Sequence, residues 1–414
     1  MKHILLPSLF FFGAATYSYG QTDDAVSLGS RCLTLGYEEA VTGSARYSAM
    51  AGARMAIGED ISTIRENPAG LGLFTEKSEI SITPDFTIGN ETNKFGLANA
   101  GAAFVLGNNH RADGYTSSAI GLSYHRLKNF GNKMRYNDAL LSEKGSNAMW
   151  SAGYGVNIGN RYFFGLGINI ITGSYELHTS NNDGSNSIDT KTTGWNVKAG
   201  TVVKLTEDIN LALALHSPSR YNFEETRAVN SNGSIDNRSS KNYNDIEYHQ
   251  WGPLKLAAGI GWHLGEKSVI DAEYSYQDFR ALNAGNSYDY FNDVKDYVES
   301  NMRCSHTIRV GFESELYNNL KGRLGTMFTT SPADTPGTEK TQGKDIGYGL
   351  NVPHQSLYVC AGAGYRYNWL YADLAYVFKN QKTDYIFSTS NSETVTTDKV
   401  LNSSEILLTI GARF

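Results

Sequence analysis

Long stretches of this chain alternate apolar and polar residues with a period of two. In the first of them, Ile80, Ile82 and Phe86 stand between polar residues, and the alternation recurs in residues 162–170 and 254–263. This period predicts strands with one apolar and one polar face. We expect about fourteen strands, near residues 79–89, 98–107, 117–128, 147–158, 161–176, 192–205, 208–218, 247–264, 267–280, 302–316, 320–330, 356–366, 369–387 and 403–414.

The connections between these strands differ in length. Tight turns are expected at residues 159–160, 206–207, 265–266, 317–319 and 368, and long polar connections near 129–146, 177–191, 219–246, 281–301, 331–355 and 388–402. Two architectures fit the alternation: a soluble sandwich whose apolar faces form a core, and a barrel whose apolar faces meet lipid. An even strand number, with long connections on one side only, favours the second architecture. The expected fold class is all-β, a transmembrane antiparallel β-barrel of about fourteen strands.

The end of the chain also favours the barrel. Residues 406–414 alternate and end on Phe414, as does the terminal strand by which outer-membrane barrels are recognised for assembly. A buried strand at the end of a soluble domain is the alternative.

A compact segment precedes the first strand. Residues 44–74 are rich in small residues and methionine, and residues 60–66 are long enough for one helical turn. The run from Asn67 through Pro68 and Ala69 to Gly70 is expected to stop any helix, because proline lacks an N–H donor and pushes the residue before it out of the α region. We expect this segment to form an N-terminal plug (hatch) inside the lumen.

The first twenty residues are typical of a secretory signal peptide. Lys2 and His3 precede a mostly apolar stretch, and small residues precede a cleavage site near Gly20. The residues before Cys32 do not form a lipobox, so no lipid anchor is expected there. The expected domains are a signal peptide at 1–20, a plug at 21–78 and a transmembrane β-barrel at 79–414.

Composition and motifs exclude several classes of protein. The 414 residues have a mean hydropathy of −0.37 and hold no apolar run of the length that a membrane helix needs. The formal net charge of −6 gives no support for nucleic-acid binding. No HExxH, Cys/His metal spacing, nucleophile elbow or phosphate loop is present, so we expect no enzyme, no metal site and no cofactor.

The combination of these features resembles a known family. A signal peptide, a plug with Asn67, Pro68 and Ala69 before a Gly-Leu continuation, about fourteen strands and a terminal Phe414 resemble the FadL/TodX family of outer-membrane transport proteins, and residues 45–73 are most similar to its Bacteroidota members. The resemblance implies a monomeric barrel in outer-membrane lipid that takes up long-chain fatty acids or other hydrophobic molecules without an energy source. It also implies capture at external loops, a tighter internal site, plug movement and lateral exit.

Two other functions stay open. A barrel of this kind could instead serve as a component of the type IX secretion shuttle, where it would bind protein partners, or it could take up haem. Pull-down of secreted proteins and titration with haemin distinguish these functions from lipid transport.

A channel for amphiphiles needs an apolar pocket with one or two cations for a carboxylate. The alternation places Lys198, Lys255, Arg309 and Arg323 on the polar, lumen-facing side of their strands. They are the ligand carboxylate candidates. The alternative is that they balance interior carboxylates in a charge network that holds the plug.

Two features are candidates for moving parts. Asn67, Pro68, Ala69 and Gly70 form either a rigid turn or the hinge of the plug, and a hinge also needs a defined resting shape. Pro84 cannot donate to a strand ladder, so it predicts a bulge or weak point in the first strand and is a candidate lateral gate.

One long connection carries a helical pattern. Phe291, Val294 and Val298 recur at helical spacing between acidic residues, which predicts a short amphipathic helix. These residues are candidates for ligand capture. The alternative is a surface helix that packs on neighbouring loops.

The three cysteines do not predict a disulfide framework. The alternation places Cys304 toward lipid and Cys360 toward the lumen, so these two are not expected to pair. A pair of Cys32 with Cys360 stays open.

Overall fold

The structure is a computed structural model of the whole chain, and it describes residues 35–36, 41–74, 77–89, 93–111, 114–181, 184–231, 242–285, 291–333, 349–388 and 394–414. The expected signal peptide, its cleavage site near Gly20 and Cys32 lie outside these residues. The boundaries of the three expected domains therefore stay a prediction.

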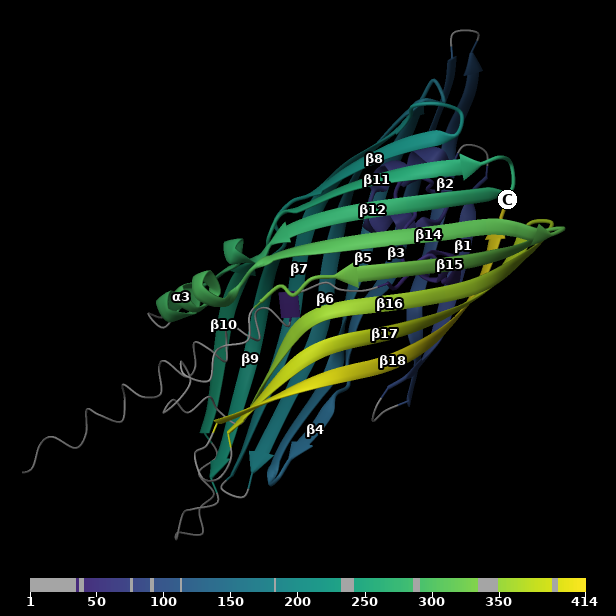
Figure 1. Cartoon of the computed structure of the whole chain (residues 1–414). Coiled ribbons are helices and arrows are strands. Elements are labelled where there is room, and N and C mark those ends of the chain that lie inside the picture. Colours follow the sequence, from purple (N-terminus) through teal and green to yellow (C-terminus); the bar gives the residue numbers. More distant parts are fainter. Residues whose placement is uncertain are drawn as a thin grey trace, which may run out of the picture.

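The strands form one closed antiparallel barrel (Figure 1). They are β1 (Glu79–Ile88), β2 (Asn93–Arg111), β3 (Gly114–Phe130), β4 (Lys133–Tyr136), β5 (Ala139–Ile158), β6 (Tyr162–Asn181), β7 (Gly184–Lys204), β8 (Ile209–His216), β9 (Arg220–Ser231), β10 (Asn242–Trp251), β11 (Lys255–Leu264), β12 (Ser268–Asp278), β13 (Asn283–Gly285), β14 (Cys304–Tyr317), β15 (Leu320–Thr329), β16 (Gly349–Tyr367), β17 (Leu370–Ser388) and β18 (Thr394–Arg413). The first and last strands close the barrel, because Glu79 pairs with Arg413 and Ile88 with Ser404.

These segments make up fourteen barrel strands, which confirms the predicted fold class. Strands β8 and β9 both pair with β7 and together form one barrel strand, as do β10 and β11. Pro218 and Pro253 lie in the interruptions within these two strands, where a residue without an N–H donor breaks the ladder. The short segments β4 and β13 prolong β3 and β12.

Several expected loops are largely strand. Residues 219–246 hold β9 and the beginning of β10, and β6 and β7 extend across most of residues 177–191. In residues 177–191 polar side chains occupy both faces of the hairpin, so the period of two fades while the backbone ladder continues. The prediction of long loops here was wrong; they are long hairpins.

The two ends of the barrel differ. Tight turns lie where they were expected, at residues 159–160, 265–266, 318–319 and 368–369. They are at the end of the barrel that also holds Arg413, the last residue of β18. We call this the tight-turn end and the opposite one the long-hairpin end. Helix α3 (Phe291–Asn301) lies at the long-hairpin end, away from the C-terminus (Figure 1).

The barrel wall has an apolar outside and a polar inside. On β6, Leu166 and Ile170 are 67% and 49% exposed, whereas Asn169 between them is 1% exposed. An outward apolar surface is what a lipid-facing wall requires, and a sandwich would bury it. No helix among the described residues is long and apolar enough to cross a membrane.

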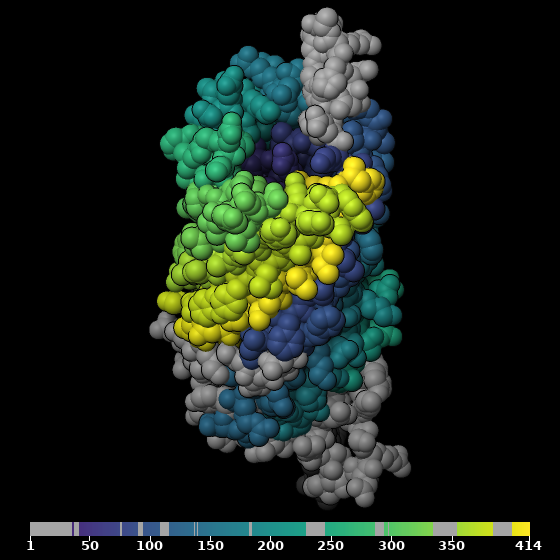
Figure 2. Space-filling view, turned by 90° about the vertical axis from the view of Figure 1, so that its right-hand side faces the viewer, coloured from purple at the N-terminus to yellow at the C-terminus, as the bar shows by residue number. Residues whose placement is uncertain are grey.

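Residues 41–74 lie inside the barrel, where they contact strands on several sides (Figure 1). They hold helix α2 (Ala45–Ala49) and the 3-10 helices η1 (Ile61–Arg65) and η2 (Pro68–Leu73). We call these residues the plug. Figure 2 shows the plug, in purple, within the opening beside the yellow C-terminal residues.

Each short helix of the plug begins at a capping side chain. Ser44 accepts a hydrogen bond from the N–H of Tyr47, Asp60 from that of Ser62, and Asn67 from that of Ala69. The expectation that residues 67–70 stop any helix was wrong in part. Helix η1 ends at Arg65, just before this run, but η2 begins at Pro68, since the first position of a helix needs no N–H donor.

Candidate functional site

Glu66 joins the plug to the barrel wall. Its carboxylate lies 2.5 Å from Nζ of Lys255 on β11, 4.0 Å from Nη2 of Arg309 on β14 and 3.7 Å from Nε of Arg65. Burial alone would raise the pKa of the Glu66 carboxyl, but Lys255, Arg309 and Arg65 hold that pKa well below its usual range. Glu66 is therefore a charged group shared by cations of the plug and the wall.

Glu313 on β14 forms a second junction, nearer the tight-turn end. Arg46 of the plug donates to it from Nε and Nη2, both at 2.8 Å, and Arg323 on β15 donates from Nε at 2.6 Å. Nζ of Lys321 lies 3.2 Å away, and Nη1 of Arg54 lies 3.6 Å away. One carboxylate is thus surrounded by four cations, two from the plug and two from the wall.

Two wall carboxylates also bind the plug backbone. Glu273 accepts hydrogen bonds from the N–H groups of Arg54 and Met55, both at 2.6 Å. Asp271, two residues earlier on β12, accepts from the next two N–H groups of the plug at 3.1 and 3.2 Å. Residues 54–57 belong to no helix that would satisfy these donors, so the wall replaces the missing partners.

The four cations predicted from the alternation all lie inside the barrel with protein partners. Lys198 donates to Oδ1 of Asn169 at 2.6 Å and to the Arg65 carbonyl at 3.3 Å. Arg323 lies 2.5 Å from Asp373. Lys255 and Arg309 contact Glu66. These contacts match the charge network that was the alternative interpretation. Their role as partners of a ligand carboxylate stays a prediction.

The sequence prediction did not single out Glu66. The alternation that located the wall cations does not apply to an irregular plug. Charge balance could have identified it, because Lys198, Lys255 and Arg309 in the lumen require acidic partners. Glu66 directly precedes the Asn67 turn in the sequence.

Asn67 holds the turn that follows. Besides capping η2, its side chain donates from Nδ2 to the carbonyls of Met55 in the plug and Thr201 in the wall, both at 3.3 Å. A Cβ on Gly165 of β6 would overlap the backbone of Pro68 and Ala69. The turn is thus held by hydrogen bonds and packs closely against the wall. Its role as a hinge stays a prediction.

The wall is irregular beside Pro84, as expected of a proline in a ladder. The register between β1 and β2 shifts between Thr83 and Pro84, which leaves Ala98 without a partner, and the ladder to β18 skips the same two residues. Beyond the bulge, pairing between β2 and β3 ends at Asn99 opposite His125, although both strands continue. We call residues 93–98 of β2 and 126–130 of β3 the unpaired seam.

Side chains close the unpaired seam. Arg126 donates to both oxygens of Asp85 on β1, at 2.7 and 2.6 Å, and to Glu405 on β18 at 2.8 Å. Lys94 donates to Oδ1 of Asn129 at 3.0 Å. The plug takes part as well, because the Thr42 hydroxyl donates to the Arg126 carbonyl at 2.6 Å.

On the long-hairpin side of the plug, the barrel interior holds a cluster of buried apolar side chains. We call these the lumen cluster, whose buried members are Leu35, Leu127, Phe130, Met134, Leu141, Met149, Ile171, Tyr175, Leu177, Ile188, Tyr221, Phe223, Tyr248, Phe279, Leu282, Ala284, Val294, Val298, Met302 and Ala333. Phe223 lies near its aromatic neighbours, with ring centroids 5.9 Å from Tyr221 and 5.0 Å from Tyr248. Leu127 and Phe130 belong to both the lumen cluster and the unpaired seam.

The predicted helix in residues 281–301 is confirmed as α3. Val294 and Val298 are 0% and 1% exposed and pack into the lumen cluster, while Phe291 is the first residue of the helix. Both valines therefore contact a ligand only if α3 moves or if the ligand enters the lumen cluster. Capture by this helix stays a prediction.

The remaining candidate chemistry is sparse. Within the described ranges, no group of three His, Cys, Asp or Glu side chains is placed to hold a metal ion. Cys360 is buried in the barrel, and Cys304 is partly exposed at the beginning of β14, as the alternation predicts.

Comparison with known proteins identifies the fold. No family model matches the sequence, and no curated protein matches it. The structure is similar to that of a Pseudomonas aeruginosa FadL homologue, with a TM-score of 0.65 and 13% identity over 91% of this chain and 99% of that one. It is also similar to the Pseudomonas putida toluene transporter TodX, with a TM-score of 0.60 and 11% identity over 91% of this chain and 99% of that one. The Ralstonia pickettii toluene transporter TbuX matches with a TM-score of 0.57 and 13% identity over 90% of this chain and 99% of that one. The chain therefore shares the fold of these proteins.

Proposed function

We propose that this chain belongs to the FadL/TodX family and takes up long-chain fatty acids or other hydrophobic small molecules across the outer membrane of a Gram-negative bacterium. It acts as a monomer in lipid, without a cofactor, after cleavage of its signal peptide near Gly20. One observation carries the proposal. The lumen of a membrane barrel is ordinarily polar, whereas here the half beyond the plug holds the lumen cluster.

The arrangement supports a lateral route. The plug blocks the barrel axis, and the unpaired seam lies where Leu127 and Phe130 of the lumen cluster meet the wall. An apolar molecule captured near α3 would bind the lumen cluster and leave through the seam into lipid. Because Thr42 of the plug bonds the Arg126 carbonyl, movement of the plug would loosen the seam.

The buried cations give the movement a trigger. A ligand carboxylate that reached Lys255 or Arg309 would compete with Glu66 and so weaken the junction between plug and wall. Lys198 and Arg323 would serve similarly at their own junctions. In this mechanism residues 67–70 are the hinge of the plug and the bulge at Pro84 is part of the lateral gate.

The experiment is uptake of a labelled long-chain fatty acid by bacteria that lack their own channel. We expect uptake with the parent chain and roughly tenfold less with Phe223→Asn, which places a polar amide among Tyr221 and Tyr248. The control is Tyr317→Asn, at a side chain that is 72% exposed at a tight turn. Matched barrel levels in the membrane make the three rates comparable.

The fatty-acid part of the proposal fails if the folded parent chain gives no uptake above the empty host, and the route through the lumen cluster fails if Phe223→Asn transports as well as the parent. The first outcome would favour other hydrophobic molecules, the secretion shuttle or haem uptake. The second would show that the lumen cluster is not on the route.

A further inference from the structure

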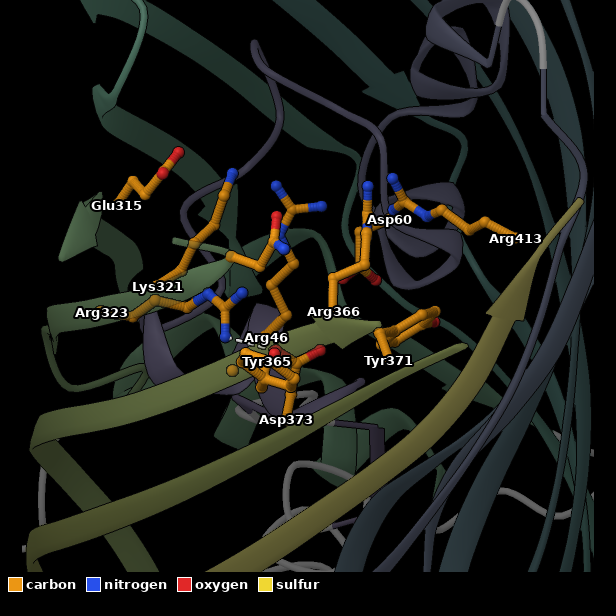
Figure 3. Close-up of a pocket in the computed structure, with 12 residues that line it drawn as sticks. Arg46, Asp60, Glu315, Lys321, Arg323, Tyr365, Arg366, Tyr371, Asp373 and Arg413 are labelled. Carbon is orange, nitrogen blue, oxygen red and sulfur yellow. Dashed lines mark hydrogen bonds and ion pairs between the residues drawn. The ribbon is translucent and has the colours of Figure 1, made fainter. Parts of the chain in front are cut away.

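The tight-turn end of the barrel holds a cavity of about 120 Å³ that the transport route does not use (Figure 3). It lies on the opposite side of the plug from the lumen cluster. Its lining is rich in charge and consists of Arg46, Asp60, Glu315, Asn319, Lys321, Arg323, Gly364, Tyr365, Arg366, Tyr371, Asp373 and Arg413. Five of these residues are cations and three are carboxylates.

The carboxylates of the lining are already occupied. Asp373 is paired with Nη1 of Arg323 at 2.5 Å. Asp60 accepts hydrogen bonds from the Ser44 hydroxyl at 2.7 Å and from the Ser62 N–H at 2.9 Å, both within the plug. The charge of Asp373 is therefore paired and the oxygens of Asp60 have hydrogen-bond donors, while Glu315 is the one lining carboxylate that lies outside these contacts.

The cations of the lining are compensated to different degrees. Nε of Arg413 lies 2.5 Å from Glu79, so the charge of Arg413 is paired. Arg46, Lys321 and Arg323 share the single carboxylate of Glu313. The guanidinium of Arg366 makes no ion pair or hydrogen bond with any residue that the structure describes, and Arg323 engages only Nε and Nη1 there. Guanidinium N–H groups without partners are available for an incoming anion.

The cations also come from both sides of the cavity. Figure 3 shows Arg46, from the plug, and Lys321, Arg323, Arg366 and Arg413, from the wall, around one common space. Arginine forms bidentate hydrogen bonds with tetrahedral oxyanions, and several arginines together match the oxygens and the double charge of a phosphate. A phosphate monoester offers three free oxygens and up to two charges, against the two oxygens and one charge of a carboxylate.

We propose that this cavity is a binding site for a phosphate-class oxyanion, which bridges the plug to the wall and stabilises the closed barrel. Free phosphate and a phosphate monoester share this chemistry. The site is independent of the transported molecule, since it lies on the other side of the plug.

The test uses the purified full chain in detergent. Calorimetric titration and thermal unfolding are measured with inorganic phosphate and with glycerol 3-phosphate, against chloride at the same ionic strength. We expect phosphate to bind and to raise the Tm, because a ligand that binds only the folded state stabilises it by mass action. Binding of both probes assigns the site to phosphate monoesters as well, and binding of inorganic phosphate alone restricts it to the free ion.

Two variants locate the site. Arg366→Gln is expected to weaken phosphate binding about tenfold, as loss of a charge-assisted hydrogen bond would, and it should fold because the side chain is exposed and unpaired. The matched control is Arg161→Gln, an exposed arginine at a different tight turn. Equal phosphate binding by Arg366→Gln and the parent, or an equal Tm in phosphate and chloride, would overturn the proposal.

Discussion

At the scale of single residues, the barrel interior is organised around carboxylates that several cations share. Glu66 and Glu313 each contact cations from the plug and from the wall. Exposed ion pairs contribute little to stability, whereas removal of one member of a buried pair leaves an uncompensated charge. The docking of the plug should therefore depend on a few residues.

Glu66→Gln tests this dependence. The substitution leaves Lys255 without its carboxylate in a buried lumen, while Arg309 keeps Glu273 at 3.7 Å, and we expect it to cost about 3–5 kcal/mol of plug docking. Docking can be followed by limited proteolysis of the plug in the purified barrel. Glu299→Gln is the control, since this glutamate is 60% exposed and pairs loosely with Lys295 on α3, so its loss should change docking by less than about 0.5 kcal/mol.

The pH dependence of docking follows from the same residue. The pKa of Glu66 is lowered in the docked plug, so its contribution is fully present above the ordinary glutamate pKa of about 4.3 and is lost as the pH falls toward the lowered value. The difference in protease resistance between the parent and Glu66→Gln should be constant from about pH 5 to 8 and shrink below about pH 4. A difference that changes between pH 5 and 8 would assign the effect to another group.

The cations that meet these carboxylates were predictable, but their partners were not. Period-two alternation places Lys255 or Arg323 on the lumen face from local sequence alone. Arg46 and Glu313 are 267 residues apart, and nothing local specifies which plug residue reaches which wall residue.

At the scale of elements, glycines in the wall let the plug approach the strands closely. A Cβ at Gly165 would overlap the backbone of Pro68 and Ala69 in η2, and backbone cannot yield as a flexible side chain can. Gly155 and Gly72 make a similar contact between β5 and η2. The plug thus explains Gly165 on β6, whereas a Cβ at Gly167 would meet Lys198 and the Ala152 carbonyl of the wall.

Gly165→Ala should displace η2. We expect a loss of about 1–3 kcal/mol of plug docking, as for other overpacked contacts, together with increased ion conductance in planar bilayers. Gly107→Ala on β2 is the matched control, because a Cβ there meets no atom within 4 Å and the barrel should stay closed. Equal conductance of the two variants would mean that η2 does not seal the barrel against Gly165.

The strands were predictable in the part of the barrel where lipid requires their outward side chains to be apolar. The fourteen strands and the tight turns follow from alternation, because outward residues must be apolar only within the membrane band. The hairpin extensions, such as β9 with β10, were missed because their outward residues are polar and their apolar residues, such as Phe223, point inward, so no lipid-facing apolar row marks them. In the sequence, only Pro84 indicated the unpaired seam. The point where pairing between β2 and β3 ends has no recognisable pattern in the sequence of either strand.

At the scale of the whole molecule, the barrel wall encloses three regions along its axis. The lumen cluster occupies the long-hairpin end, the plug fills the middle, and the cation-lined cavity opens at the tight-turn end (Figures 2 and 3). The unpaired seam lies beside the first region. In the proposed mechanism, a molecule that enters at the long-hairpin end meets the lumen cluster and the unpaired seam before it meets the plug.

The central claim, that the lumen cluster receives the hydrophobic molecule, is tested most directly by photolabelling. A photoreactive long-chain fatty acid is added to the purified barrel, with and without excess unlabelled fatty acid, and labelled residues are mapped by mass spectrometry. We predict competed labels on lumen-facing residues near Phe130, Tyr175 and Phe223. Labels confined to outward side chains such as Leu166, or labels that excess fatty acid does not displace, would contradict the account.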